Sequence, residues 1–233
     1  MKYFKINQKF YNDNDRIVSS AEGEKIPNSN YFFNKLRNGE VISNIPILDY
    51  FYLKSFDEEK YWEYELNDVH NFIGEGSQIK GWLISRKLKD LFDTFYLPKH
   101  YYFYLSKLLY KGEKLDYYIF QFAGKLIFEE TLLQIDYTNT IFWDPIKKLE
   151  VIVNDEKEFL SRYKEIYKEN GGLENGIQNK KLILKEAFDF FSMQTFMKDN
   201  IVSERLKNSI EKNKIKGFEF LELDYEVIVN ISL

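Results

Sequence analysis

The segment Val202-Ser203-Glu204-Arg205-Leu206-Lys207 closely resembles an earlier one, Ile84-Ser85-Arg86-Lys87-Leu88-Lys89. In each segment a serine precedes apolar residues that recur at helical spacing. A serine hydroxyl at such a position can accept one of the backbone N–H groups that the first helical turn leaves unpaired. The residues on the apolar faces are Ile84, Leu88, Leu91, Phe92 and Phe95 in the first helix, and Val202, Leu206 and Ile210 in the second. We therefore predict that Ser85 and Ser203 are helix caps.

Each of these helices is followed by residues that favour β-strands. Residues 101–110 and 115–122 are rich in aromatic side chains, and Lys111-Gly112-Glu113-Lys114 between them suits a hairpin turn. After the second helix, residues 218–223 alternate between apolar and polar side chains. The chain thus runs twice through a strand end, a serine cap, a helix and a strand. This order is explained equally well by two related α+β halves and by two independent caps.

The remaining segments predict one more helix and several strands. Asp155 is placed to cap a helix over residues 155–169, which carries one apolar face. Strands are predicted at residues 48–53, 61–66 and 140–143, within or after an irregular β region over residues 1–56, and an exposed loop at residues 171–181. The helix capped by Ser85 is expected to continue up to Pro98.

Together these elements predict an α+β fold with a largely antiparallel β-sheet and about three packed helices. We divide the chain into residues 1–78, a β-rich acidic N-terminal region, and residues 79–233, an α+β domain. One continuous domain over all 233 residues is the alternative.

The composition excludes several classes of function. The sequence has no cysteine and only two histidines, His70 and His100, which argues against disulfides, thiolate metal sites and a Ser-His-Asp triad. No glycine-rich phosphate loop is present, so we expect neither a metal nor an organic cofactor. The net charge of −4 argues against nucleic acid binding over the whole surface. No apolar stretch approaches 18 residues and the N-terminus lacks a signal core, so we expect a cytoplasmic protein that does not enter a membrane.

Three residue groups admit a catalytic or binding role beside a structural one. Ser85 and Ser203 lack the flanking glycines and neighbouring base of a nucleophile, so capping is favoured. His70 and His100 lack a third ligand in the sequence pattern, so isolated histidines on the surface or in the core are favoured over a metal pair. The aromatic runs at residues 101–104 and 117–120 could stack nucleic acid bases, but strands with aromatic side chains on both faces more often lie buried in a sheet.

The charge is distributed unevenly along the chain. Residues 40–79 contain nine acidic side chains and only two lysines, so this segment carries −7 while the other residues sum to +3. The acids are Glu40, Asp49, Asp57, Glu58, Glu59, Glu63, Glu65, Asp68 and Glu75. A solvated face would explain them, but so would a surface that attracts a basic protein partner. For the second interpretation the candidate partner-binding residues are Asp57, Glu58, Glu59, Glu63 and Glu65.

Three motifs resemble a family of bacterial immunity proteins from polymorphic toxin systems, formerly classed as a domain of unknown function. They are Gly81-Trp82-Leu83-Ile84-Ser85, Val202-Ser203-Glu204-Arg205-Leu206-Lys207 and Gly217-Phe218-Glu219-Phe220, and the similarity covers about residues 70–223. The resemblance implies a non-catalytic protein that neutralises a cognate toxin domain encoded by a neighbouring gene. It implies no catalytic residues, and the motif residues are scaffold.

Two other classes of function stay open at the level of sequence. One is a hydrolase that uses carboxylates, for which a pocket would have to hold two acids with a raised pKa. The other is a structural or adaptor domain. Neither resemblance nor composition assigns residues to these alternatives.

Overall fold

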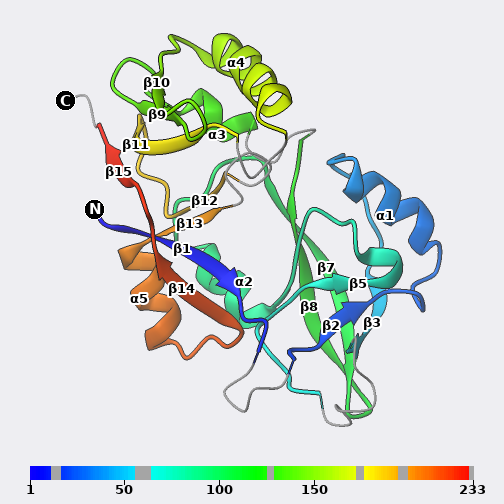
Figure 1. Ribbon diagram of the computed structural model, residues 1–233. Coiled ribbons are helices and arrows are strands. Elements are labelled where there is room, and N and C mark those ends of the chain that lie inside the picture. The colour runs from blue at the N-terminus through cyan, green and yellow to red at the C-terminus, as the bar shows by residue number, and fades with distance from the viewer. Residues whose placement is uncertain (12–16, 56–63, 125–128, 172–175, 194–198, 231–233) are drawn as a thin grey trace.

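The computed structural model describes the chain except for residues 12–16, 56–63, 125–128, 172–175, 194–198 and 231–233 (Figure 1). Its α-helices are α1 (Ser29–Arg37), α2 (Arg86–Phe92), α3 (Glu129–Leu133), α4 (Glu156–Glu169) and α5 (Glu204–Lys212), with a 3₁₀ turn at Gly74–Gly76. Its strands are β1 (Tyr3–Gln8), β2 (Ser20–Glu22), β3 (Leu48–Lys54), β4 (Val69–His70), β5 (Phe72–Ile73), β6 (Gly81–Ser85), β7 (Tyr101–Tyr110), β8 (Glu113–Phe122), β9 (Ile141–Asp144), β10 (Leu149–Val151), β11 (Gln178–Leu184), β12 (Phe190–Ser192), β13 (Asn200–Ser203), β14 (Phe218–Glu222) and β15 (Glu226–Val229).

The largest sheet of the described chain has the order β4-β6-β8-β7-β3-β2-β5. Its centre is the antiparallel β7–β8 hairpin, which turns at Lys111 and Gly112. Both turn residues have positive φ, the conformation that matches the twist of the adjoining strands. Side chains of β6 alternate between two cores, since Leu83 packs with residues of α1 and Ile84 packs with residues of α2. The two helices therefore cover opposite faces of this sheet.

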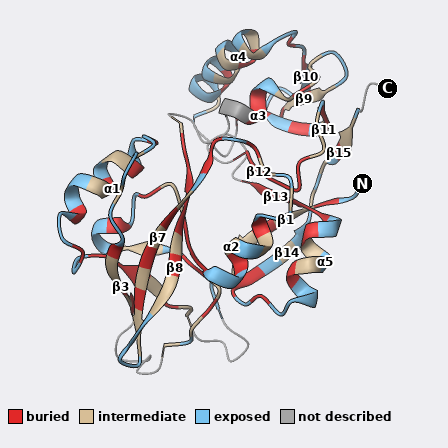
Figure 2. Cartoon of the chain, turned by 180° about the vertical axis from the view of Figure 1, so that it is seen from behind, coloured by how far each residue is buried: buried red, intermediate tan, exposed pale blue. Residues whose placement is uncertain are grey.

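A second sheet, with the antiparallel order β12-β13-β1-β14, shares its core with the first. The ring of Trp82 lies in this shared core and contacts Phe120 of the first sheet and both Phe190 and Phe218 of the second. Leu88 of α2 is completely buried in the same cluster. Figure 2 shows the buried residues along β7 and β8 and the exposed ones on the outer sides of α1 and α5.

A third sheet, with the order β10-β9-β11-β15, packs with α4 around a separate core. Phe142 of β9 and Phe159 of α4 are buried there with ring centroids 4.9 Å apart. Asp155 caps α4 by accepting a hydrogen bond from the Glu158 backbone N–H at 2.8 Å, which confirms the expected cap. The Glu158 carboxylate in turn accepts a hydrogen bond from the backbone N–H of Asn154, the residue before the cap, at 2.9 Å.

The α+β fold and its largely antiparallel strands are confirmed, but the described chain holds five α-helices where about three were expected. The region at residues 1–56 is not entirely β, because it contains α1 between Asn28 and Asn38, two residues of a type common in turns. These residues flank the helix, and the side chains of Phe33 and Leu36 on one of its faces are buried. Short helices between turn residues are hard to distinguish from loops by spacing alone.

Three further predictions were wrong, one about a strand and two about where an element ends. Residues 64–66 belong to no strand, and residues 61–63 lie outside the described residues. The helix capped by Ser85 ends at Phe92, well before Pro98. The exposed loop predicted at residues 171–181 ends early, because β11 begins at Gln178 and pairs with β9 and β15. Cross-strand partners, which local spacing does not show, stabilise this polar strand end.

The N-terminal region at residues 1–78 contributes strands to both sheets of the shared core. Strand β1 lies between β13 and β14, and β4 pairs with β6. Within the described residues, no helix is long and apolar enough to cross a membrane.

Candidate functional site

Both predicted serine caps are present. Ser85 ends β6 and its Oγ accepts a hydrogen bond from the Leu88 backbone N–H at 3.2 Å. Ser203 ends β13 and accepts one from the Leu206 backbone N–H at the same distance. Both serines have the extended backbone typical of an N-cap. The capping roles of Ser85 and Ser203 are therefore confirmed.

Each cap hydroxyl also donates a hydrogen bond to an aspartate. Ser85 Oγ lies 2.6 Å from Asp68 Oδ1, and Ser203 Oγ lies 2.6 Å from Asp189 Oδ1. Each aspartate carbonyl in turn accepts a 2.8 Å hydrogen bond from the backbone N–H of the same serine. The hydroxyl oxygens thus face a helix terminus and a carboxylate, as structural caps do.

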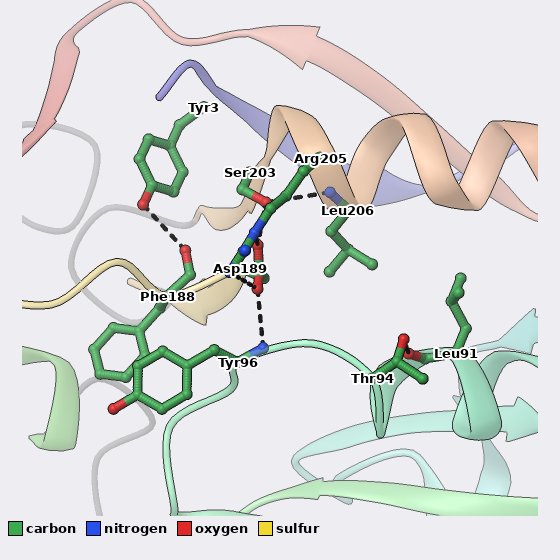
Figure 3. A network of polar contacts seen from close by, with 9 residues as sticks. All are labelled: Tyr3, Leu91, Thr94, Tyr96, Phe188, Asp189, Ser203, Arg205 and Leu206. Carbon is green, nitrogen blue, oxygen red and sulfur yellow. Dashed lines mark hydrogen bonds and ion pairs between the residues drawn. The ribbon is translucent and has the colours of Figure 1, made fainter.

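The second oxygen of each aspartate binds a backbone N–H far away in the sequence. Asp68 Oδ2 accepts from Lys216 N at 2.8 Å, and Asp189 Oδ2 accepts from Tyr96 N at 2.9 Å (Figure 3). Lys216 follows α5 and Tyr96 follows α2. We define the Asp68 clasp as Asp68, Ser85 and Lys216, and the Asp189 clasp as Asp189, Ser203 and Tyr96. Each clasp joins the start of one helix to the turn after the other helix.

The Asp189 clasp carries an additional cation. Arg205, in the first turn of α5, donates to both carboxylate oxygens of Asp189, and its NH2 group lies 2.6 Å from Oδ2 (Figure 3). Its pKa is raised, mainly by this hydrogen bond. Tyr96 stacks on Phe188 with ring centroids 5.0 Å apart, and its hydroxyl donates to Glu186. The clasp is thus a rigid polar group at the surface, built on a buried carboxylate.

Of the five acidic residues predicted to bind a partner, only Glu65 is described; Asp57, Glu58, Glu59 and Glu63 lie outside the described residues. The Glu65 carboxylate is exposed and lies 3.7 Å from Lys216 Nζ, next to the Asp68 clasp. Its backbone carbonyl accepts a hydrogen bond from Ser19 Oγ. Its partner-binding role stays a prediction.

The two histidines lie in separate surroundings. His70 is buried on β4, where its Nε2 accepts from the Asn67 N–H at 3.2 Å and its Nδ1 donates to the Ser19 carbonyl at 3.0 Å. Burial lowers the pKa of His70 to about 4, so the ring is neutral at pH 7. His70 is thus a core histidine with satisfied nitrogens. His100 contacts the ring of Tyr101 instead.

The aromatic runs belong mainly to the cores. Tyr101, Tyr104, Tyr117 and Phe120 are buried, while Tyr102 is 36% exposed. Tyr101 uses its hydroxyl to accept from the Ser192 N–H at 2.9 Å. These contacts leave no continuous stack of exposed rings on β7 and β8, so the predicted core role is confirmed.

Three pockets lined by described residues hold few carboxylates. The largest of three described pockets, about 490 Å³, lies beside Gly39 and Gly124 and is lined by Lys99, His100 and Tyr102, with no carboxylate. Two smaller ones contain a single acid between them, Glu150. Nor do any three histidine, aspartate or glutamate side chains of the described residues gather into a cluster that could hold a metal ion.

Sequence reasoning missed the two aspartates of the clasps. Asp68 was counted only as part of the acidic stretch, and Asp189 was not singled out. The distance to the cap serine is 17 residues for Asp68 and 14 for Asp189, so a comparison at fixed spacing does not align them. The local feature that the two aspartates share is that each directly precedes a short strand, β4 after Asp68 and β12 after Asp189.

No protein-family model matches this sequence, and no curated protein matches it either.

Proposed function

We propose that this protein is an immunity protein that binds a cognate bacterial toxin domain in the cytoplasm and blocks it sterically, without catalysis. The proposal rests on the resemblance of the three motifs. Their residues are scaffold in that family, and they occupy scaffold positions in this structure.

The observation that carries the proposal is the packing of the motifs against one another. Trp82 of the first motif and Phe218 of the third have ring centroids 5.4 Å apart. Ile84, Leu206 and Phe218, one from each motif, are buried in one core. Segments more than 100 residues apart thus form a single structural unit, which supports a resemblance in fold over a coincidence of composition.

The charge of the chain supports a basic partner. Residues 40–79 carry −7, and complementary charge accelerates association and disfavours wrong partners. Toxins that act on nucleic acids need cationic surfaces to engage phosphates. We therefore propose that Asp57, Glu58, Glu59, Glu63 and Glu65 contribute to partner binding.

The test is co-expression with the C-terminal domain of the toxin encoded beside this gene. Growth arrest should be relieved and the two proteins should co-purify. Titration of purified toxin should require one molecule of this protein for each toxin molecule, because steric blocking is stoichiometric whereas a hydrolase would protect at catalytic amounts. An unrelated toxin domain is the control and should stay active. Folded protein that neither binds nor protects would overturn the proposal.

A further inference from the structure

We infer that this protein contains an internal duplication whose two copies latch each other: the aspartate of each copy holds the turn that follows the helix of the other. The first copy comprises β4, β6, α2, β7 and β8, and the second comprises β12, β13, α5, β14 and the N-terminal strand β1. The inference does not depend on the proposed function.

The strand pairings of the two copies match residue by residue. In the first copy β4 pairs with β6 so that Val69 lies opposite Ile84. In the second copy β12 pairs with β13 so that Phe190 lies opposite Val202. Val69 and Phe190 each follow the clasp aspartate directly, and Ile84 and Val202 each precede the cap serine. The short strands therefore have the same register relative to both ends of the clasp.

The central strands also correspond. Ser85 lies opposite Tyr117 of β8, and Ser203 lies opposite Tyr3 of β1. The hydroxyl of Tyr117 donates to the Asn67 carbonyl at 2.6 Å, and that of Tyr3 donates to the Phe188 carbonyl at 3.1 Å. Both acceptors directly precede a clasp aspartate. Equal registers with equal side-chain hydrogen bonds identify β1 as the counterpart of β8.

The helices present matching cations to these strands. Lys89, four residues after Ser85, lies over the rings of Tyr118 and Phe103 at 5.8 and 5.9 Å. Lys207, four residues after Ser203, lies over the rings of Phe4 and Phe220 at 5.1 and 5.4 Å. The aromatic residues occupy equivalent places on the central and the following strand.

Each lysine also pairs with an acid four residues further along the chain, Asp93 at the C-cap of α2 and Glu211 in α5. Such surface pairs add little stability. Their equal spacing from the cap serine is a further correspondence between the copies.

The two copies differ in how the chain connects them. In the first copy β8 follows β7 through the turn at Lys111 and Gly112. In the second copy the equivalent strand is β1, at the other end of the chain (Figure 1). The second copy is therefore completed by a strand that precedes the first copy in the sequence, and β1 pairs with β13 and β14 across the length of both copies.

The clasps make the two copies depend on each other. Asp68 belongs to the first copy and holds Lys216 of the second, while Asp189 belongs to the second copy and holds Tyr96 of the first. An acid three residues before each aspartate contacts the side chain of the same held residue, Glu65 with Lys216 and Glu186 with Tyr96. Loss of one clasp aspartate therefore removes the hydrogen bond to the cap serine of its own copy. It also removes the hydrogen bond to the turn that follows the helix of the other copy.

Amide hydrogen exchange of the full-length protein under native conditions tests the latch. Asp189→Asn should accelerate exchange about tenfold in residues 93–97 of the opposite copy as well as at Leu206. Asp68→Asn should do the same in residues 214–217 and at Leu88. Asp116→Asn is the matched control, because Asp116 pairs with Arg86 and Lys107 outside either clasp. In the Asp116→Asn variant the exchange rates of residues 93–97 and 214–217 should stay at their wild-type values.

Acceleration confined to the mutated copy, or uniform acceleration over the whole chain, would overturn the latch. If the aspartate variants do not fold, Ser203→Ala and Ser85→Ala, which remove the hydroxyl hydrogen bonds to Asp189 and Asp68, should accelerate exchange in the same opposite turns. Tyr3→Phe and Tyr117→Phe test the equivalence of the central strands, since each removes one hydroxyl and preserves the ring. Tyr3→Phe should accelerate exchange in residues 188–192 and Tyr117→Phe in residues 67–70. Absence of an effect of Tyr3→Phe in the second copy would refute the equivalence of β1 and β8.

Discussion

Arg205 donates hydrogen bonds to both carboxylate oxygens of Asp189, whose side chain is 0% exposed, while the Arg205 side chain itself is 58% exposed. The buried charge is thus compensated by a cation that remains in contact with water. The exposed guanidinium thus escapes much of the desolvation penalty that it would incur in a fully buried ion pair. It also explains why Asp189 can be more deeply buried than Asp68.

Arg205→Ala should lower the free energy of unfolding by about 1.5–3 kcal/mol, the range for hydrogen bonds to charged groups. The matched control is Lys87→Ala, since Lys87 occupies the same place relative to its cap serine and donates to the Lys214 carbonyl at the surface. That variant should stay within about 0.5 kcal/mol of the wild type. Urea denaturation measures both, and equal losses would contradict the special role of Arg205.

Ser85→Ala and Ser203→Ala should each destabilise the protein by about 0.5–2 kcal/mol. Ser203→Ala should cost more, because Ser203 is fully buried and Ser85 is 8% exposed. Ser161→Ala, at an exposed position inside α4, is the control and should be neutral within about 0.5 kcal/mol. Toxin protection should persist wherever folded protein remains. Loss of protection at unchanged stability would instead place the serine in a binding site.

His70 should make stability depend on pH. Its pKa falls from 6.5 to about 4 on folding because the ring is buried, so the unfolded chain binds the proton more tightly. The stabilisation is complete above pH 6.5 and is lost as the pH falls from 6.5 towards 4. Between pH 7.5 and 5.5 the loss should be about 1.3 kcal/mol, from the ordinary and lowered pKa values.

His70→Gln should remove this dependence, so the difference in unfolding free energy between pH 7.5 and 5.5 should shrink in the variant. Asp and Glu contribute little in that window, because their ordinary pKa values lie near 4. NMR offers an independent measurement, since the chain contains only two imidazole side chains. A His70 resonance with a midpoint near 6.5 would show that the prediction is wrong.

Reversal of Asp57, Glu58 and Glu59 to lysine should slow association with a basic toxin domain by about tenfold at low ionic strength. The defect should shrink at physiological salt, where exposed charges are screened. The control is the reversal of Glu113, Glu150 and Glu226, which are exposed acids outside the acidic stretch, with the same change in net charge. Stopped-flow mixing gives both rates. Equal association rates for the two triple variants would return Asp57, Glu58 and Glu59 to the role of a solvated face.

Local features of the structure followed from the sequence where the interaction is short in range. The caps at Ser85, Ser203 and Asp155 were predictable because a side chain needs only the N–H three residues further along the chain. The β7–β8 hairpin was predictable for the same reason, since Lys111 and Gly112 join strands that pair directly. The similarity of the segments at residues 84–89 and 202–207 also indicated the repeat.

The clasps and the completion of the second copy depend on the tertiary structure. The helix capped by Ser85 was expected to reach Pro98, but it ends at Phe92 and the Tyr96 N–H binds Asp189, which lies 93 residues away. Likewise, β1 lies between β13 and β14 because hydrogen-bond partners near the other end of the chain hold it. Periodicity and capping describe residues within a few positions of each other, so the sequence determined the two cap–helix units. Only the folded chain, where Asp68 meets Lys216 and Asp189 meets Tyr96, decided how those units close one another.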